Sequence, residues 1–150
     1  MNHPFRSSLE WTGSTSSAAY SRDYVIRIAG KPDLAGSADK QFRGSAARHN
    51  PEELLVAALS SCHLLSYLYL CSRAGISVTR YVDEAEGSLK MEGASGRFER
   101  AVLRPRVTIA KGGDSAKAKE LHHEAHRLCF VANSVNFPVD CEPVVELATV

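Results

Sequence analysis

Residues 50–71 read N-P-E-E-L-L-V-A-A-L-S-S-C-H-L-L-S-Y-L-Y-L-C and contain the longest apolar run of the chain. Three residues at its start suit a helix N-terminus: Asn50 at the N-cap, Pro51 at the first helical position and Glu53 in a capping box. Gly75 is typical of the position just after a last helical turn. The pattern predicts a helix from Pro51 to just before Gly75. Because it is apolar almost all round, we expect it to lie buried at the centre of the protein.

Strands and one further helix are predicted around this segment. Alternating and β-branched residues indicate strands at residues 20–30, 76–91 with a bend near Gly87, 97–110 and 143–150. Asp114 or Ser115 can cap a second helix that runs to about Phe130, and the polar segment 31–50 is expected to be a loop. Strands and helices do not alternate regularly, so we expect an α+β fold rather than a doubly wound sheet, with the long helix packed on β-sheet.

Length and composition limit the domain organisation and the partners. The 150 residues include 18 basic and 17 acidic side chains, for a net charge of +1. We therefore expect a single domain over residues 1–150 and no binding to nucleic acid through bulk charge. The N-terminal segment lacks the apolar stretch of a signal peptide, and three serines and His63 interrupt the long apolar run. We therefore expect a cytoplasmic protein that neither spans nor binds a membrane.

The chain has four cysteines and no C-x-x-C motif, which argues against a structural zinc site and a thioredoxin-type site. Helical periodicity places Cys62 on an inward stripe of the first helix and Cys129 on the inward side of the second, near its end. Two inward helices on one core could bring these thiols together. The simpler alternative is two independent core cysteines, because free cysteine is among the most buried residues. Cys71 and Cys141 are expected to be packing residues.

A reactive Cys62 would need a nearby cation, because burial in an apolar helix raises a thiol pKa. The candidates are Arg22, Arg43 and Arg48, and Glu52 is available to hold such an arginine in place. Glu52 lies ten residues before Cys62, which is ~15 Å along a straight helix. The two side chains can hardly share one site within one helix. If both serve one thiol, either a second copy of the chain donates Glu52 or the two helices cross, and this geometry points to a homodimer with a shared active site.

Two segments resemble the OsmC/Ohr family of thiol peroxidases. N-P-E-E-L-L-V-A-A-L-S-S-C, residues 50–62, resembles the family's helix entry and reactive cysteine, with the Glu-to-Cys spacing of the family pattern. A-H-R-L-C-F-V-A-N-S-V-N-F-P-V, residues 125–139, is similar to its second characteristic segment and places Cys129 at the resolving cysteine. Phe130 stands where the Ohr branch usually has proline, so the chain looks like a less characterised branch. The resemblance implies an intertwined α+β homodimer with a long buried central helix.

The resemblance also implies a mechanism. The Cys62 thiolate attacks a hydroperoxide and becomes a sulfenic acid, and Cys129 condenses with it to a Cys62–Cys129 disulfide that an external dithiol reduces. Arg22 would lower the Cys62 pKa, and Glu52 would orient the arginine. The apolar lining favours organic hydroperoxides, which fits a role in oxidative-stress defence. No metal or organic cofactor is needed.

Other activities remain open from the residues alone. The same cysteines would serve a non-enzymatic redox-sensing dimer. The same fold could also bind an apolar ligand in an interface pocket, with core cysteines that never oxidise. Residues 122–126, H-H-E-A-H, place His122 and His126 one turn apart, but we expect a solvated helix face there rather than a metal site. His63 points ~100° away from Cys62 on a helix, so a Cys–His hydrolase dyad is not expected.

Overall fold

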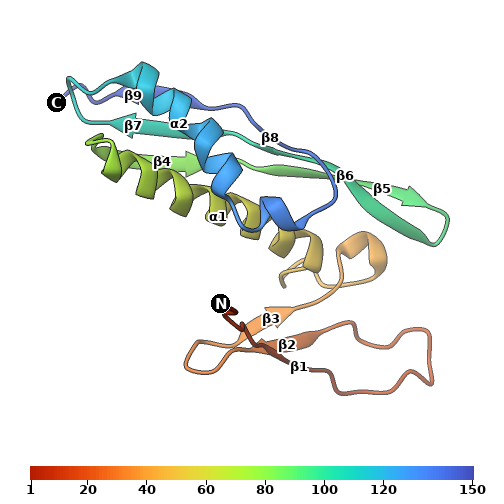
Figure 1. The fold of residues 1–150 in the computed structure, drawn as a ribbon. Helices are drawn as coiled ribbons and strands as arrows, with labels where there is room; N and C mark the ends of the chain where they lie inside the picture. The colour runs from red at the N-terminus through yellow and green to blue at the C-terminus, as the bar shows by residue number, and fades with distance from the viewer. The chain divides into compact units, whose positions relative to one another are not determined.

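A computed structural model describes all residues, 1–150, as a mixed α+β fold (Figure 1). The α+β class predicted from the sequence is confirmed. The chain forms two compact units, Met1–Leu54 and Leu55–Val150. The expectation that residues 1–150 are a single domain stays a prediction.

The first unit is built on a small antiparallel sheet with β2 at its centre. Its elements are β1 (Ser8–Glu10), β2 (Tyr24–Arg27), β3 (Leu34–Gly36) and the 3₁₀ helix η1 (Lys40–Phe42). The strand expected at residues 20–30 is therefore shorter than predicted, and the expected loop at residues 31–50 contains β3 and η1. Strands of three residues are too short to show an alternating pattern, which is why the sequence did not reveal them.

Helix α1 (Pro51–Arg73) begins and ends where its sequence predicts. The Asn50 side chain accepts a hydrogen bond from the Glu53 N–H at 2.8 Å, and the Glu53 carboxylate accepts one from the Asn50 N–H at 3.4 Å. This is the predicted capping box. Gly75 has a positive φ of 71°, the conformation in which glycine commonly ends a helix.

The buried face of α1 differs from the predicted one. Helical spacing puts Leu65 and Tyr69 on the same stripe as Cys62, which the sequence predicts to face inward, but Leu65 is 67% exposed and Tyr69 is 60% exposed. The fully buried residues lie four apart, at Leu59, His63, Tyr67 and Cys71. A helix that is apolar all round has no unique inward face in its sequence, so the packing partners select it. By length and composition α1 could also cross a membrane, a property shared by core helices of soluble proteins.

The second unit contains two three-stranded sheets. One has the order β4 (Val78–Asp83), β7 (Pro105–Ile109), β9 (Val144–Leu147), and the other has the order β5 (Glu86–Glu92), β6 (Ser95–Leu103), β8 (Val139–Cys141). The β5–β6 pair forms a hairpin, and both it and the β4–β7 pair are antiparallel. Strands β8 and β9 add in parallel to β6 and β7.

Both long strands predicted in this unit are broken. Residues 76–91 divide into β4 and β5, and residues 97–110 divide into β6 and β7 at Arg104. At this break the Asp83 carboxylate accepts a hydrogen bond from the Arg104 N–H at 2.7 Å, taking the place of a strand-to-strand bond. Strand β8 was not predicted, and the expected strand at 143–150 is shorter.

Helix α2 (Ser115–Leu128) packs beside α1 on the same face of β7. Asp114 caps it, accepting a hydrogen bond from the Lys117 N–H at 2.9 Å. The shared core joins the inward residues of β7 to both helices: Val107, Ile109, Tyr67, Cys71, Ala118, Leu121 and Ala125. The Tyr67 hydroxyl donates to the Ala118 carbonyl at 2.9 Å, which links α1 directly to α2. Helix α2 ends before Cys129, slightly earlier than predicted, and the 3₁₀ helix η2 (Ala132–Ser134) follows.

Replacing Asn50 by alanine is expected to lower the free energy of unfolding by about 1–2 kcal/mol. The side chain is buried, caps α1 and also donates to the Asp39 carboxylate at 3.2 Å. Urea unfolding followed by circular dichroism measures the change. Asn136→Ala, at an exposed position, is the matched control and should leave the midpoint unchanged. Equal midpoints for the two variants would show that the cap does not stabilise the protein.

Candidate active site

The structure brings Cys62 and Cys129 together. Cys62 is half-buried in the middle of α1, and Cys129 is buried just after the last turn of α2. The Cys62 side chain is close enough to the Cys129 thiol to raise its pKa. Both cysteines are free thiols. Two helices that pack on one core thus place two thiols next to each other, although they are far apart in the sequence.

The surroundings of Cys129 keep it protonated. Burial raises the pKa of its thiol, and the adjacent Cys62 side chain raises it further. The Ala132 N–H points at the Cys129 sulfur at 3.5 Å and opposes this effect without reversing it. At neutral pH Cys129 is therefore a thiol rather than a thiolate. Such a thiol is poorly suited to attack a substrate first. It is suited to form a bond with the sulfur of a neighbouring cysteine and to supply a proton.

The other two cysteines are also poor nucleophiles. Burial raises the pKa of the Cys71 thiol, and Cys71 lies in the hydrophobic core. Burial together with the carboxylates of Asp83 and Glu142 raises the pKa of Cys141 to about 12. Cys141 does not simply fill the core as expected, because its sulfur lies against two histidine side chains.

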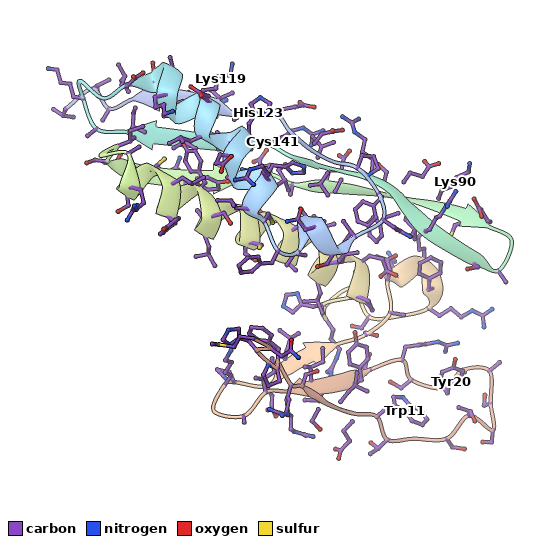
Figure 2. All side chains as sticks on the ribbon, viewed as in Figure 1. Trp11, Tyr20, Lys90, Lys119, His123 and Cys141 are labelled. Atoms are coloured by element: carbon purple, nitrogen blue, oxygen red, sulfur yellow. The ribbon has the colours of Figure 1, made fainter.

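Arg22 and Glu52 line one pocket of the first unit, with a volume of about 360 Å³. Four aromatic residues share it: Trp11, Tyr20, Tyr24 and Phe42. The Arg22 guanidinium lies 3.9 Å from the centroid of the Tyr20 ring and donates to the Tyr20 carbonyl at 2.5 Å. The hydrogen-bond partners of Arg22 are backbone carbonyls rather than Glu52, and the buried Oε2 of Glu52 has no hydrogen-bond partner. Figure 2 labels Trp11 and Tyr20, whose rings meet edge to face on this unit.

The two alternative arginines have other partners. The Arg48 guanidinium donates to the Gly36 carbonyl at 2.9 Å and to the Tyr24 carbonyl at 2.6 Å, so it braces β2 and β3. Arg43 is exposed and ends η1 with a positive φ of 66°. Arg22 alone of the three lines the aromatic pocket together with Glu52.

A second polar cluster lies inside the second unit, and sequence reasoning missed it. His63 Nε2 of α1 lies 3.0 Å from His122 Nδ1 of α2, and the Cys141 sulfur of β8 lies 3.8 Å from His63 Nε2. Figure 2 shows Cys141 beside α2. His122 was expected on a solvated face with His126, but it is 2% exposed, whereas His126 is exposed. A histidine four residues from Leu59 and Tyr67 was the available signal that His63 faces inward.

Burial also governs the charge of the two histidines. It lowers the pKa of His63 to about 4 and that of His122 to about 3, and their mutual proximity lowers the pKa of His122 further. Both imidazoles are therefore neutral at neutral pH, and each keeps one nitrogen lone pair.

Comparison with known proteins connects these residues to a family. The model of the OsmC family, OsmC-like protein, matches residues 44–143. Among solved structures, an OsmC-like protein of unknown function from Vibrio cholerae is 30% identical, with 95% of this chain and 100% of that chain covered and a TM-score of 0.87.

More distant relatives agree with this match. An organic hydroperoxide resistance protein from Elizabethkingia anophelis shares the fold at 18% identity, with 99% of this chain and 100% of that chain covered and a TM-score of 0.70. The uncharacterized protein YmaD of Bacillus subtilis is 23% identical over 109 residues, which is 71% of this chain and 73% of YmaD. Since the family match includes both Cys62 and Cys129 and extends over well more than half of the sequence, this chain belongs to the family of OsmC-like proteins.

Proposed function

We propose that this protein is a cysteine-based peroxidase that reduces organic hydroperoxides in the cytoplasm. The observation that carries the proposal is the contact between a half-buried Cys62 and a buried, protonated Cys129. Oxidation of two neighbouring thiols can join them in a disulfide. Membership of the OsmC-like family and the hydroperoxide resistance named for some fold relatives support the same chemistry.

The proposed reaction has two steps at the cysteine pair. The Cys62 thiolate attacks one oxygen of the hydroperoxide, the O–O bond breaks, and the alkoxide takes a proton and leaves as the alcohol. Cys62 is then a sulfenic acid. The Cys129 sulfur attacks the Cys62 sulfur, and the sulfenic hydroxyl leaves as water with the Cys129 proton. An external dithiol transfers two electrons to the disulfide and restores both thiols. The reaction consumes no metal and no organic cofactor.

The proposed active site is shared between two copies of the chain. Glu52 lies ten residues before Cys62 on α1, about 15 Å along a straight helix. Glu52 therefore cannot serve the Cys62 thiol of its own chain. The homodimer also explains the exposed apolar residues of α1, of which Leu65 and Tyr69 are the most exposed. In this dimer Arg22 and Glu52 of one copy serve Cys62 of the other.

The aromatic pocket supports an organic rather than an inorganic substrate. It offers apolar ring surface together with the Arg22 guanidinium and the unpartnered Glu52 carboxylate oxygen. Burying an alkyl or aryl group there gains about 25 cal/mol per Å² of apolar surface, a term that hydrogen peroxide lacks. The same pocket would suit a protein that only binds an apolar ligand, and oxidation of the cysteine pair distinguishes the two activities.

One equivalent of cumene hydroperoxide is expected to form a Cys62–Cys129 disulfide with a mass loss of two hydrogens. Intact mass and peptide mapping detect it. In Cys62→Ser no disulfide should form, whereas Cys71→Ala should behave as the wild type, because Cys71 lies in the hydrophobic core and not at the pair. Turnover with dithiothreitol should be faster with cumene hydroperoxide than with hydrogen peroxide. If both thiols stay reduced, the peroxidase proposal fails and the ligand-binding activity is favoured.

Iodoacetamide at neutral pH is expected to alkylate Cys62 before the other three cysteines. Raised pKa values keep Cys71, Cys129 and Cys141 protonated at neutral pH, and thiols react through their thiolates. Their alkylation should accelerate only as the pH rises above the usual thiol range. Peptide mapping over a time course measures the order. Alkylation of Cys141 or Cys71 before Cys62 contradicts the assignment of Cys62 as the attacking thiol.

Mixing two inactive variants tests the shared active site. Cys62→Ser and Glu52→Ala are each expected to lose most activity, but their mixed dimer contains one intact site if Glu52 serves the partner's thiol. Random exchange at equal amounts should then restore about one quarter of wild-type activity. Arg43→Ala, at an exposed arginine, is the control that should stay active. An activity of the mixture equal to the mean of the two variants, or a monomer in sedimentation that retains turnover, would overturn the shared site.

A further inference from the structure

We infer that His63, His122 and Cys141 form a binding site for a divalent transition-metal ion of the zinc type. The three side chains come from α1, α2 and β8 of one compact unit. Their nitrogen and sulfur donor atoms all lie within 4.8 Å of one another. The site takes no part in the proposed peroxidase reaction and does not depend on it.

The donor set and its spacing fit such an ion. Imidazole nitrogen and thiolate sulfur are the donors that zinc prefers, with bonds of about 2.0–2.1 Å and about 2.3 Å. A tetrahedral centre with these bonds separates two nitrogens by about 3.4 Å and a nitrogen and a sulfur by about 3.6 Å. The corresponding distances here are 3.0 Å between the nitrogens, and 3.8 and 4.0 Å from Cys141 Sγ to His63 Nε2 and His122 Nδ1. Movements of a few tenths of an ångström therefore complete the geometry.

A buried polar group near the cluster has no hydrogen-bond partner within the protein. The hydroxyl of Tyr81 is buried without a hydrogen-bond partner. Buried polar groups without partners are uncommon and need an explanation such as a bound ion or water. Tyr81 lies near the same cluster: its ring centroid is 5.9 Å from that of Tyr67, and burial, followed by the nearby Asp83 and Cys141, raises its pKa. A metal ion with a bound water would place a polar group in this buried region.

The electrostatic surroundings favour a cation. The Asp83 carboxylate acts on both His63 and Cys141, and Glu142 also acts on Cys141. Asp83 is held in place by the Ser60 hydroxyl at 2.5 Å and by the Arg104 N–H at 2.7 Å. Negative charge beside a buried site stabilises a divalent cation that enters it.

The proton balance of binding is simple. Each imidazole would bind through the nitrogen that faces the cluster and carry its proton on the other one: Nδ1 of His63 and Nε2 of His122. Cys141 must release its thiol proton, and one proton therefore leaves the protein for each ion that enters. The ion replaces the hydrogen bond that now joins His63 Nε2 and His122 Nδ1.

A groove of about 790 Å³ gives access to the site. His122 and Cys141 line it from one side, and Lys119, His123 and His126 lie around it. Three protein donors leave one position of a tetrahedral ion for water or another small ligand, as in metal sites that bind exchangeable ligands. The groove makes this fourth position reachable from solvent.

Cobalt(II) provides the probe, because a thiolate bound to it produces a charge-transfer band in the near ultraviolet. Full-length protein, stripped with a chelator and kept reduced, is expected to bind one Co²⁺ per chain with this band and to release one proton. Zn²⁺ should bleach the band. Cys141→Ser should abolish it, and His122→Asn and His63→Gln should weaken binding at least about tenfold.

Three variants serve as matched controls. Cys71→Ala removes a buried cysteine of α1 outside the cluster, and His126→Asn removes the exposed histidine one turn from His122. Cys62→Ser removes the attacking thiol of the proposed peroxidase. All three should keep the band, so failure of the metal site and failure of the peroxidase proposal give different results. Loss of the band in Cys62→Ser, with retention in Cys141→Ser, would overturn the assignment.

X-ray absorption on zinc-loaded wild-type protein avoids variants that do not fold. The expected first shell is one sulfur at about 2.3 Å and two or three nitrogen or oxygen atoms at about 2.0–2.1 Å. Two sulfurs would indicate the Cys62–Cys129 pair, and none would indicate surface histidines. Either of those results, or the absence of saturation at one ion per chain, contradicts the proposed site.

Discussion

The burial of one stripe of α1 is the constraint on which the second unit depends. Leu59, His63, Tyr67 and Cys71 lie four residues apart, and strand β7 and helix α2 are held against this stripe. The Tyr67 hydroxyl satisfies the Ala118 carbonyl of α2, and the Tyr67 ring stacks on His122 with centroids 3.9 Å apart. Because polar contacts of this kind are directional, they set the position of α2 along α1 more strictly than apolar packing would. That position brings the functional side chains of both helices together.

Two consecutive residues of α1 serve two different centres. Cys62 and His63 point about 100° apart around the helix, so one faces Cys129 and the other faces His122. Both partners belong to α2 or to the residue that ends it. A single helix pair thus creates a cysteine pair and a buried histidine cluster side by side. Their environments differ, because carboxylates act on Cys141 of the cluster, whereas Cys62 and backbone N–H groups act on Cys129.

Local sequence signals identified the helices that have clear capping residues. Long-range contacts explain the strand boundaries and pairings that the sequence did not reveal. The N-caps at Asn50 and Asp114 were predictable because each capping bond closes within three residues. The division of residues 76–91 and 97–110 into four strands was not, because it depends on Asp83 meeting Arg104 across the sheet. The parallel pairing of β8 with β6 and of β9 with β7 could not be predicted from the sequence either, since the partner strands lie about forty residues earlier in the chain.

The order of residues in the chain was enough to predict the limits of α1, the start of α2, the α+β class, the family and the two cysteines of the candidate site. These features depend on spacing within one helix or one short segment, where neighbouring residues interact directly. Which stripe of α1 is buried, and which histidines meet, depended on tertiary packing. His63 and His122 are 59 residues apart, and His63 and Cys141 are 78 apart. No local periodicity records such a meeting, because it exists only when two helices and a strand close on the same core.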